Sequence, residues 1–265
     1  MSGTPPPEAR HELRWEVGFA CPVPIADDRC ATPYLRWHHF DPPWRVRPHY
    51  YVPGMIALCQ EHHEQAEAGE FSVEQLREFK LAGRDGAEKL RGRLGWMREK
   101  LLAVVGGNFY YETRVPLQIG PQAVVGFDRD EQGHFRLDVN VPSTTGEPRL
   151  RIDKNDWVET GIPADLECPP GGRLVKVRYA AGDVFSLELH EVPTETALLE
   201  RYQDTALPRH LDRHAHAFEY PLLTAEITLQ VVDVLDLGPR ATRVTGPDVV
   251  PAGAFAGHGS VGLQL

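Results

Sequence analysis

The chain has 265 residues, of which 42% are hydrophobic and 25% are charged, a composition typical of a globular protein. Its length allows one large domain or two modest ones. The formal net charge of −10 argues against a generic protein that coats nucleic acid, which would be strongly basic. The acidic excess is uneven, because residues 1–104 carry 14 basic and 15 acidic side chains and are therefore nearly neutral. A nearly neutral region can still bind phosphate through a local group of arginines.

The beginning of the chain is rich in proline and polar residues, and no run approaches the length of about 18 apolar residues that a transmembrane helix needs. We therefore expect neither a signal peptide nor a transmembrane helix, and a cytoplasmic location. The chain contains four cysteines. Without an export signal, they favour metal binding over disulfide bonds.

The first part of the chain is expected to form a small fold around a metal. We expect a disordered leader at residues 1–10 and a metal module at residues 11–82. Residues 11–70 of this module are rich in Cys, His, Trp and Pro but have little periodicity. Ser72 and Gln75 have the spacing of a capping box, so a helix should begin there. A further apolar stripe predicts a second helix, which makes residues 83–107 a helical connector.

From residue 108 the pattern changes to short apolar runs that alternate and are separated by turns. The turn at residues 130–133 lies between two such runs and predicts that they are antiparallel neighbours. We expect residues 108–245 to form a β-rich, antiparallel, sandwich-like domain with a short helix at 194–202. Residues 246–265 should form a flexible tail, in which residues 248–250 could be a last edge strand. The fold class predicted for the whole chain is α+β.

Three of the four cysteines lie in the His-rich first part and predict a structural zinc site. Cys59 and His62 are three residues apart, which places both ligands on one turn at the start of a helix. Cys21 and Cys30 lie upstream on a loop that contains prolines. These four residues could form a closed Cys₃His tetrahedron around Zn²⁺; the alternative is that the cysteines are buried free thiols.

Two adjacent histidines, His38 and His39, lie in a strand-like segment, so their side chains should point to opposite faces. His63 follows His62 on the predicted helix and should point away from the zinc, with Glu67 one turn further along the same face. His38, His63 and Glu67 could hold one divalent metal ion. A neutral imidazole is a good general base, so His39 could activate a water molecule for attack on a phosphodiester.

This arrangement resembles the HNH family of endonucleases, also called ββα-metal or His-Me finger nucleases, over residues 18–80. The resemblance rests on the cysteines, on the pair His38-His39 in a strand, and on the histidines His62 and His63 at the start of a helix. It implies that His38 and His63 bind a catalytic metal such as Mg²⁺ or Mn²⁺ and that His39 is the general base. It also implies that the zinc site holds the strands and the helix of the motif together.

Two positions depart from the pattern of the family. The Asn that commonly holds the active loop and orients the base corresponds to Gly54. The final histidine of some members is replaced by Glu67, whose carboxylate could still coordinate a hard cation. His49, in the loop between the strand and the helix, is a candidate substitute for the missing Asn.

Other side chains near the motif suit a nucleic-acid substrate. Arg36, Arg45 and Arg47 could clamp phosphates, the alternative being that they are solvated surface charges. Trp44 and Tyr50 could stack on bases, but aromatic residues of a small metal fold more often form its core.

The sequence thus predicts a divalent-metal-dependent endonuclease that hydrolyses phosphodiester bonds of nucleic acid, with DNA as the expected partner. The alternative is an HNH-like module that keeps its zinc but has lost catalysis, in a binding or scaffold protein whose β-rich domain carries recognition. Gly54 and the overall acidity favour this alternative. The β-rich domain could also bind a protein partner or form a homo-oligomer. A different enzyme could use His210, His214 and His216, although their pattern lacks a glutamate base.

Overall fold

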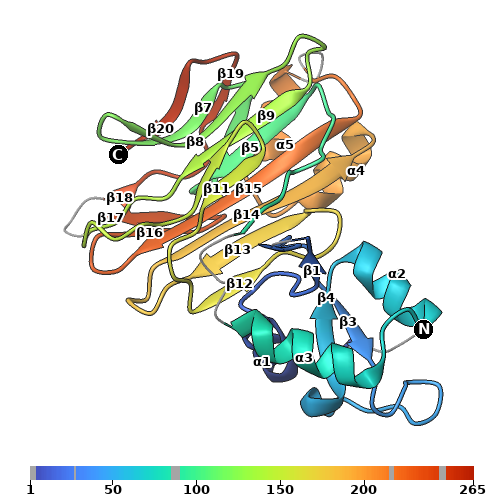
Figure 1. Ribbon diagram of the computed structural model, residues 1–265. Coiled ribbons are helices and arrows are strands. Elements are labelled where there is room, and N and C mark those ends of the chain that lie inside the picture. The colour runs from blue at the N-terminus through green and yellow to red at the C-terminus, as the bar shows by residue number, and fades with distance from the viewer. Residues whose placement is uncertain (1–3, 27, 85–89, 215–217, 245–248) are drawn as a thin grey trace.

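The computed structural model describes residues 4–26, 28–84, 90–214, 218–244 and 249–265. Within these ranges it has five α-helices and extensive β-sheets, so the predicted α+β class is confirmed. Figure 1 shows a small N-terminal part, coloured blue to cyan, beside a larger β-rich part. The buried apolar residues of the N-terminal part form a cluster that is separate from the two clusters of the β-rich part.

The N-terminal part is built from short strands and three α-helices. In chain order these elements are α1 (Pro7–Glu16), β1 (Pro24–Ile25), β2 (Asp28–Arg29), β3 (Arg36–His39), the 3-10 helix η1 (Val52–Gly54), β4 (Met55–Leu58), α2 (Gln60–Ala68) and α3 (Val73–Gly83). β1 and β2 form a small hairpin, and β3 pairs antiparallel with β4. Because β4 is completely buried and α2 follows it at once, β3, β4 and α2 form one packed unit.

Local sequence sets the ends of the two helices that follow β4. The Sγ atom of Cys59 accepts a hydrogen bond from the backbone N–H of His62 and so caps the start of α2, and Gly69 ends this helix with a φ of 83°. The side chain of Ser72 and that of Gln75 form the capping box that the sequence predicted at the start of α3.

The β-rich part consists of two sheets. The six-stranded sheet has the order β11-β10-β9-β8-β7-β20, and the ten-stranded sheet has the order β12-β13-β14-β15-β16-β17-β18, with β5 beside β15, β6 beside β5, and β19 beside β6. The first sheet contains β7 (Val115–Ile119), β8 (Gln122–Arg129), β9 (Phe135–Asn140), β10 (Arg151–Asp153), β11 (Asp156–Glu159) and β20 (Val261–Gln264). The second contains β5 (Leu101–Val105), β6 (Asn108–Tyr111), β12 (Asp165–Glu167), β13 (Leu174–Arg178), β14 (Val184–Val192), β15 (Leu222–Val231), β16 (Leu235–Leu237), β17 (Thr242–Val244), β18 (Val249–Val250) and β19 (Phe255–Gly257).

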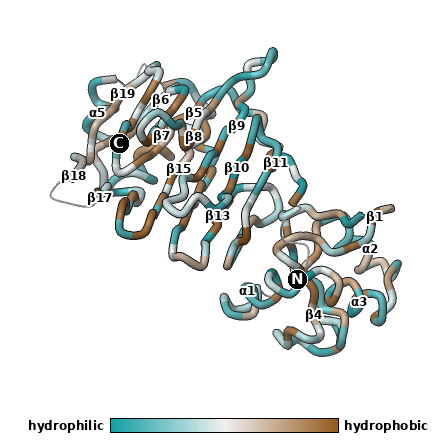
Figure 2. The backbone as a smooth tube through the Cα atoms, turned by 60° about the vertical axis from the view of Figure 1, so that its left-hand side comes forward, coloured by the Kyte–Doolittle hydropathy of each residue, from teal (hydrophilic) through white to brown (hydrophobic). Residues whose placement is uncertain are grey.

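Alternation along the strands divides the apolar side chains of this part between two cores. In β5, Leu101 and Ala103 belong to the core that both sheets share, whereas Leu102 and Val104 belong to a second core that includes residues of α4 (Glu195–Arg201) and α5 (Leu207–His214). Figure 2 shows the hydrophobic residues concentrated along the strands of this part. The predicted antiparallel neighbours on either side of residues 130–133 are β8 and β9, and the short helix expected at 194–202 is α4.

The disordered leader predicted for residues 1–10 is wrong for residues 7–10, which form the first turns of α1. Residues 1–3 lie outside the described part of the chain. Pro7 occupies the first position of this helix, where a proline is well tolerated, and Leu13 is completely buried on one face. The helix links the two parts of the protein, since Arg14 donates three hydrogen bonds of 2.9–3.1 Å to the carboxylate of Asp165 in β12.

The helical connector predicted over residues 83–107 is also wrong, although residues 85–89 lie outside the described part. Residues 90–100 contain no helix, and β5 is buried along its whole length. Leu90 and Leu94, which suggested a helical stripe, pack into the shared core from a segment without helical structure. A continuous apolar run fits a buried strand as well as a helix, so periodicity alone could not distinguish the two.

The flexible tail predicted for residues 246–265 is replaced by strands from residue 249 onward; residues 246–248 lie outside the described part. β18 pairs with β17 and fits the edge strand that the sequence suggested. β19 pairs parallel with β6, and β20 pairs parallel with β7. Parallel pairing with strands far earlier in the chain gives no local signal in the sequence, and the Gly-rich composition of this region suggested disorder instead.

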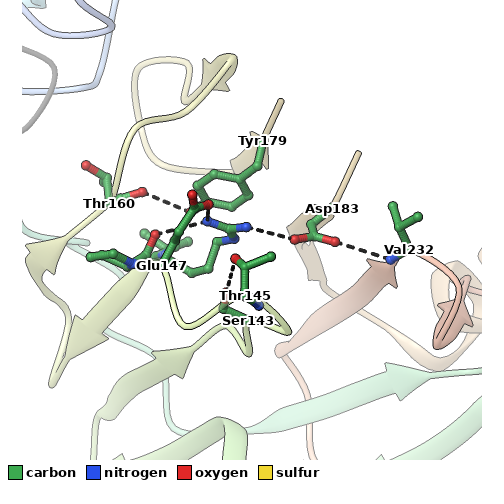
Figure 3. A network of polar contacts seen from close by, with 10 residues as sticks. Ser143, Thr145, Glu147, Thr160, Tyr179, Asp183 and Val232 are labelled. Carbon is green, nitrogen blue, oxygen red and sulfur yellow. Dashed lines mark hydrogen bonds and ion pairs between the residues drawn. The ribbon is translucent and has the colours of Figure 1, made fainter. Parts of the chain in front are cut away.

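A buried ion pair links the two sheets. Nη2 of Arg149, just before β10, lies 3.1 Å from Oδ2 of Asp183, just before β14, and both side chains are only 4% exposed. The guanidinium carbon lies 4.3 Å from the centre of the Tyr179 ring. The Tyr179 hydroxyl donates to the carbonyl of Thr160 and accepts from the backbone N–H of Leu150 (Figure 3). This network fixes the loops at one end of the sandwich.

We expect Arg149→Ala to lower the free energy of unfolding by about 3 kcal/mol, because the Asp183 carboxylate would remain buried without its cation. Chemical denaturation measures this change. Arg93→Ala is the control, since the Arg93–Asp156 pair is 57% and 56% exposed and should contribute less than about 1 kcal/mol. Equal losses in the two variants would contradict the structural role of the buried pair.

Candidate metal centres

A Cys₃His cluster lies between the β1–β2 hairpin and the start of α2. Cys21 precedes β1, Cys30 follows β2, and Cys59 and His62 lie at the N-terminus of α2. One ligand atom from each lies within 4.8 Å of the others. Nδ1 of His62 is 3.3 Å from Sγ of Cys21 and 3.1 Å from Sγ of Cys59, and the sulfur atoms of Cys30 and Cys59 are 4.0 Å apart.

These separations, from 3.1 to 4.0 Å, lie on either side of those around a tetrahedral metal ion. Typical zinc–sulfur and zinc–nitrogen distances give ligand–ligand separations of about 3.6–3.8 Å around tetrahedral zinc. Hydrogen bonding with Cys30 and Cys59, together with burial, raises the pKa of the Cys21 thiol, whereas hydrogen bonding with Cys21 lowers the pKa of Cys30. A cation would replace the protons that these crowded sulfur atoms share. The Cys₃His cluster could therefore bind a metal such as zinc, and the four residues predicted as its ligands all belong to it.

We expect the purified protein to contain about one zinc ion per chain, and Cys59→Ser to lose most of it, because tetrahedral zinc needs all four ligands. Elemental analysis of the purified variants measures the zinc content. Cys168→Ser is the matched control, since Cys168 is equally a buried cysteine but lies outside the cluster. A zinc content unaffected by Cys59→Ser would contradict the assignment.

A second group of possible ligands lies between β3 and α2. His38, His63 and Glu67 each offer an atom within 4.8 Å of the others. Nδ1 of His38 is 3.2 Å from Oε1 of Glu67, and the rings of His38 and His63 meet edge to face with centroids 5.5 Å apart. His63 and Glu67 are four residues apart on α2, so both face β3. The three residues predicted to hold a divalent ion therefore lie together.

The two histidines of this group are suited to bind a metal. Burial lowers the pKa of His38, and the nearby His63 lowers it further. Burial also lowers the pKa of His63, with an added contribution from the positive charge of Arg36. Neutral imidazole is the form that coordinates metals, so no proton has to be displaced near pH 7. Nε2 of His63 lies 3.2 Å from the carbonyl oxygen of Trp37, which fixes the orientation of the ring.

His39 lies on the other side of β3, among aromatic residues of the following loop. Its ring centroid is 4.7 Å from that of Trp44 and 5.1 Å from that of His49. Burial, aided by the proximity of His49, lowers the pKa of His39 to about 4, so the ring is neutral at pH 7. Its Nε2 atom is buried and has no hydrogen-bond partner among the described residues. A neutral imidazole with a free nitrogen can accept a proton.

The loop between β3 and η1 is held mainly by backbone groups. The N–H groups of Phe40 and Asp41 both donate to the carbonyl oxygen of Gly54, at 3.0 and 3.2 Å. Across the loop, Nε2 of His49 donates to the carbonyl oxygen of Pro42 at 2.8 Å. A Cβ atom at position 54 would lie only 1.9 Å from the carbonyl oxygen of Asp41. Glycine is therefore the residue that this loop requires at the position where the HNH pattern has Asn.

Restoring that Asn should harm the protein. We expect Gly54→Asn to lower the free energy of unfolding by about 2 kcal/mol or more, because its Cβ would displace the backbone of Asp41. Thermal or chemical denaturation measures the loss. Gly95→Asn is the control, because a Cβ at that position meets no atom within 4 Å. If the two variants are equally stable, the loop is more adaptable than its hydrogen bonds indicate.

The three arginines predicted to bind substrate are all exposed, and two of them, Arg36 and Arg45, lie near these ligands. Nη2 of Arg45 is 3.8 Å from Oε2 of Glu67, and the Arg45 side chain is 88% exposed. Arg36 lies beside His63, and both line a hollow of about 350 Å³ at the junction with the β-rich part. Arg47 lies two residues beyond Arg45 on the loop. Their positions are compatible with binding an anionic substrate.

Arg10, which was not among the predicted site residues, lines the same hollow and pairs with Glu167 at 3.3 Å. It was missed because residues 1–10 had been interpreted as a disordered leader. The signal was present in the sequence: Pro7 is followed by Ala9 and Leu13, an i, i+4 apolar pair that packs in the N-terminal core.

The third candidate group, His210, His214 and His216, is not supported as a site. Nε2 of His210 lies 2.8 Å from the carbonyl oxygen of Gly253, and its ring stacks on Phe255. The side chain of His214 and the whole of His216 lie outside the described part of the structure. His210 therefore has a structural explanation, which is the packing of α5 against β19.

None of the helices in the described ranges is long and apolar enough to cross a bilayer. Comparisons of the chain with protein-family models, with curated proteins and with solved structures gave no match.

Proposed function

We propose that the protein is a divalent-metal-dependent endonuclease of the HNH type, which hydrolyses phosphodiester bonds of nucleic acid. The observation that carries the proposal is the convergence of His38, His63 and Glu67 on one side of β3. His39, on the other side of the strand, is neutral, and its Nε2 atom has no hydrogen-bond partner among the described residues. Two imidazoles and a carboxylate suit a divalent transition-metal ion such as Mn²⁺ better than Mg²⁺, which prefers oxygen ligands, and they leave positions for water and substrate. The Cys₃His cluster has a separate, structural role.

In the proposed reaction, a water molecule transfers its proton to Nε2 of His39. The water oxygen forms the new bond to phosphorus, and the bond to the leaving sugar oxygen breaks. A divalent ion held by His38, His63 and Glu67 would stabilise the negative charge on the phosphate and on the leaving oxygen. Arg36 and Arg45 would bind neighbouring phosphates and so hold the scissile bond in position.

The second candidate is a zinc-binding module without catalysis, in a protein whose β-rich part recognises a partner or forms a homo-oligomer. Two observations favour it. Gly54 replaces the Asn that orients the base in the HNH pattern, and the backbone around it leaves no room for that side chain. Nε2 of His39 is also buried, so a water molecule can reach it only if the loop over His39 shifts.

Cleavage assays distinguish the two candidates. With Mg²⁺ or Mn²⁺, we expect the wild type to cut supercoiled plasmid or single-stranded nucleic acid. Cleavage should cease when EDTA chelates the metal ion. His39→Ala should reduce the rate roughly 100-fold or more, as is typical for loss of a general base. His134→Ala is the control, because His134 lies in the β8–β9 turn beside Asp130.

Zinc content and thermal stability are measured on the same preparations, so that a misfolded variant is recognised. If folded, zinc-loaded wild type cuts none of these substrates with any of the metals, the endonuclease proposal fails and the binding module is favoured. If His39→Ala cuts as fast as wild type, the activity does not use the proposed base.

A further inference from the structure

The loop after β3 ends in an exposed tip formed by Arg45, Val46 and Arg47. Val46 is 75% exposed, although it is an aliphatic residue, and the side chain of Arg45 is 88% exposed. Apart from the 3.8 Å contact between Arg45 and Glu67, no carboxylate pairs with either arginine among the residues that the structure describes. The tip therefore presents one exposed apolar side chain between two exposed guanidinium groups that could bind an anion. Figure 1 shows this blue loop projecting at the lower right, away from the β-rich part.

The tip is a preformed structure. The N–H groups of Val46 and Arg47 both donate to the carbonyl oxygen of Pro43, at 2.9 and 3.2 Å. Below the tip, His49 donates to the carbonyl of Pro42, and the rings of Trp44 and Tyr50 pack with centroids 5.6 Å apart. A segment ordered in this way loses little conformational entropy when it binds. Val46 is thus held away from any core by the backbone of its own loop.

The tip also lies next to the site proposed to cleave phosphodiesters. Trp44, the residue before the tip, packs on His39 with ring centroids 4.7 Å apart. Arg45 reaches Glu67, one of the three candidate metal ligands. A substrate whose scissile phosphate lies at these ligands would meet the tip within the neighbouring nucleotides.

The chemistry of the tip fits duplex DNA better than a single strand. Proteins that kink duplex DNA from the minor groove insert apolar side chains, such as those of Leu, Ile or Met, between base steps, while Arg and Lys side chains read the groove. Valine shares the branched aliphatic character of these wedges. Binding of a single strand relies instead on aromatic faces that stack on successive bases, and valine has no such face. Residues 1–104 are nearly neutral, because the acidic excess of the chain lies beyond residue 104.

We propose that Val46 is a wedge that enters the minor groove of duplex DNA and partly unstacks one base step, with Arg45 and Arg47 on the flanking phosphates. This inference rests on the proposed endonuclease function and adds to it that the substrate is duplex DNA, kinked at the site of cleavage. Flexible pyrimidine–purine steps such as TA cost least to unstack and are the preferred positions.

The wedge is tested with short DNA duplexes that carry 2-aminopurine in a TA step, because the fluorescence of this base rises when it is unstacked. The full chain is used with Ca²⁺ in place of Mg²⁺, and anisotropy measures binding on the same duplexes. We expect wild type to bind and to raise the fluorescence several-fold. Val46→Ser should lose more than half of this rise, whereas Val46→Leu should keep it.

Leu81→Ser is the matched control, since Leu81 is an aliphatic residue that is 80% exposed on α3, and it should leave the fluorescence unchanged. Arg45→Gln and Arg47→Gln should each weaken duplex binding and lower the salt dependence of log K by about 1. The inference is overturned if the 2-aminopurine fluorescence of bound duplex does not rise, if Val46→Ser keeps the full fluorescence rise, or if the protein binds no duplex DNA. Tighter binding of single strands or of duplex RNA, independent of Val46, would also overturn it.

Plasmid cleavage in parallel separates this inference from the proposed function. Cleavage by wild type without any fluorescence rise refutes the wedge and leaves the endonuclease intact. A rise that depends on Val46 in a protein that does not cut with any metal refutes the endonuclease and leaves the wedge as a DNA-binding device.

Discussion

In the small N-terminal part, a Cys₃His cluster that could bind a metal such as zinc joins two segments that lie far apart in the sequence. It ties the β1–β2 hairpin, through Cys21 and Cys30, to the start of α2. Cys59 is at once a member of this cluster and the N-cap, so the cluster and the start of the helix meet at the same point of the chain. Since successive residues of a helix point about 100° apart, His62 can face the cluster while His63 faces β3. The candidate catalytic ligands are therefore positioned by the structural ones.

Much of this site could be predicted from sequence because it is local. The spacing of Cys59, His62, His63 and Glu67 on one helix determines which side chains share a face, and adjacent histidines in a strand point apart. His38 accordingly lies with His63 and Glu67, and His39 lies among the loop aromatics. The capping box at α3 and most strands of the β-rich part also follow from local patterns. That the predicted ligands lie together supports a metal site but leaves the reaction itself a proposal.

The features that the sequence did not reveal depend on distant contacts. The apolar run of β5 fits a helix or a strand until its partners β15 and β6 are known, and β19 and β20 become ordered only by pairing with β6 and β7. The need for glycine at position 54 arises because the backbone of Asp41 passes close by. From sequence alone, Gly54 is notable only because it replaces the Asn of the HNH pattern. In the structure, its carbonyl oxygen accepts the backbone hydrogen bonds of Phe40 and Asp41 that fix the loop.

The most direct test of the account is whether the zinc-loaded protein binds a second divalent ion at His38, His63 and Glu67. Mn²⁺ binding, followed by electron paramagnetic resonance on protein of known zinc content, measures this without requiring any activity. We expect one Mn²⁺ per chain in addition to zinc, and loss of Mn²⁺ but not of zinc in His63→Ala. Absence of Mn²⁺ binding in the wild type, or Mn²⁺ binding unchanged by His63→Ala, would contradict the assignment of these three residues as a catalytic metal site.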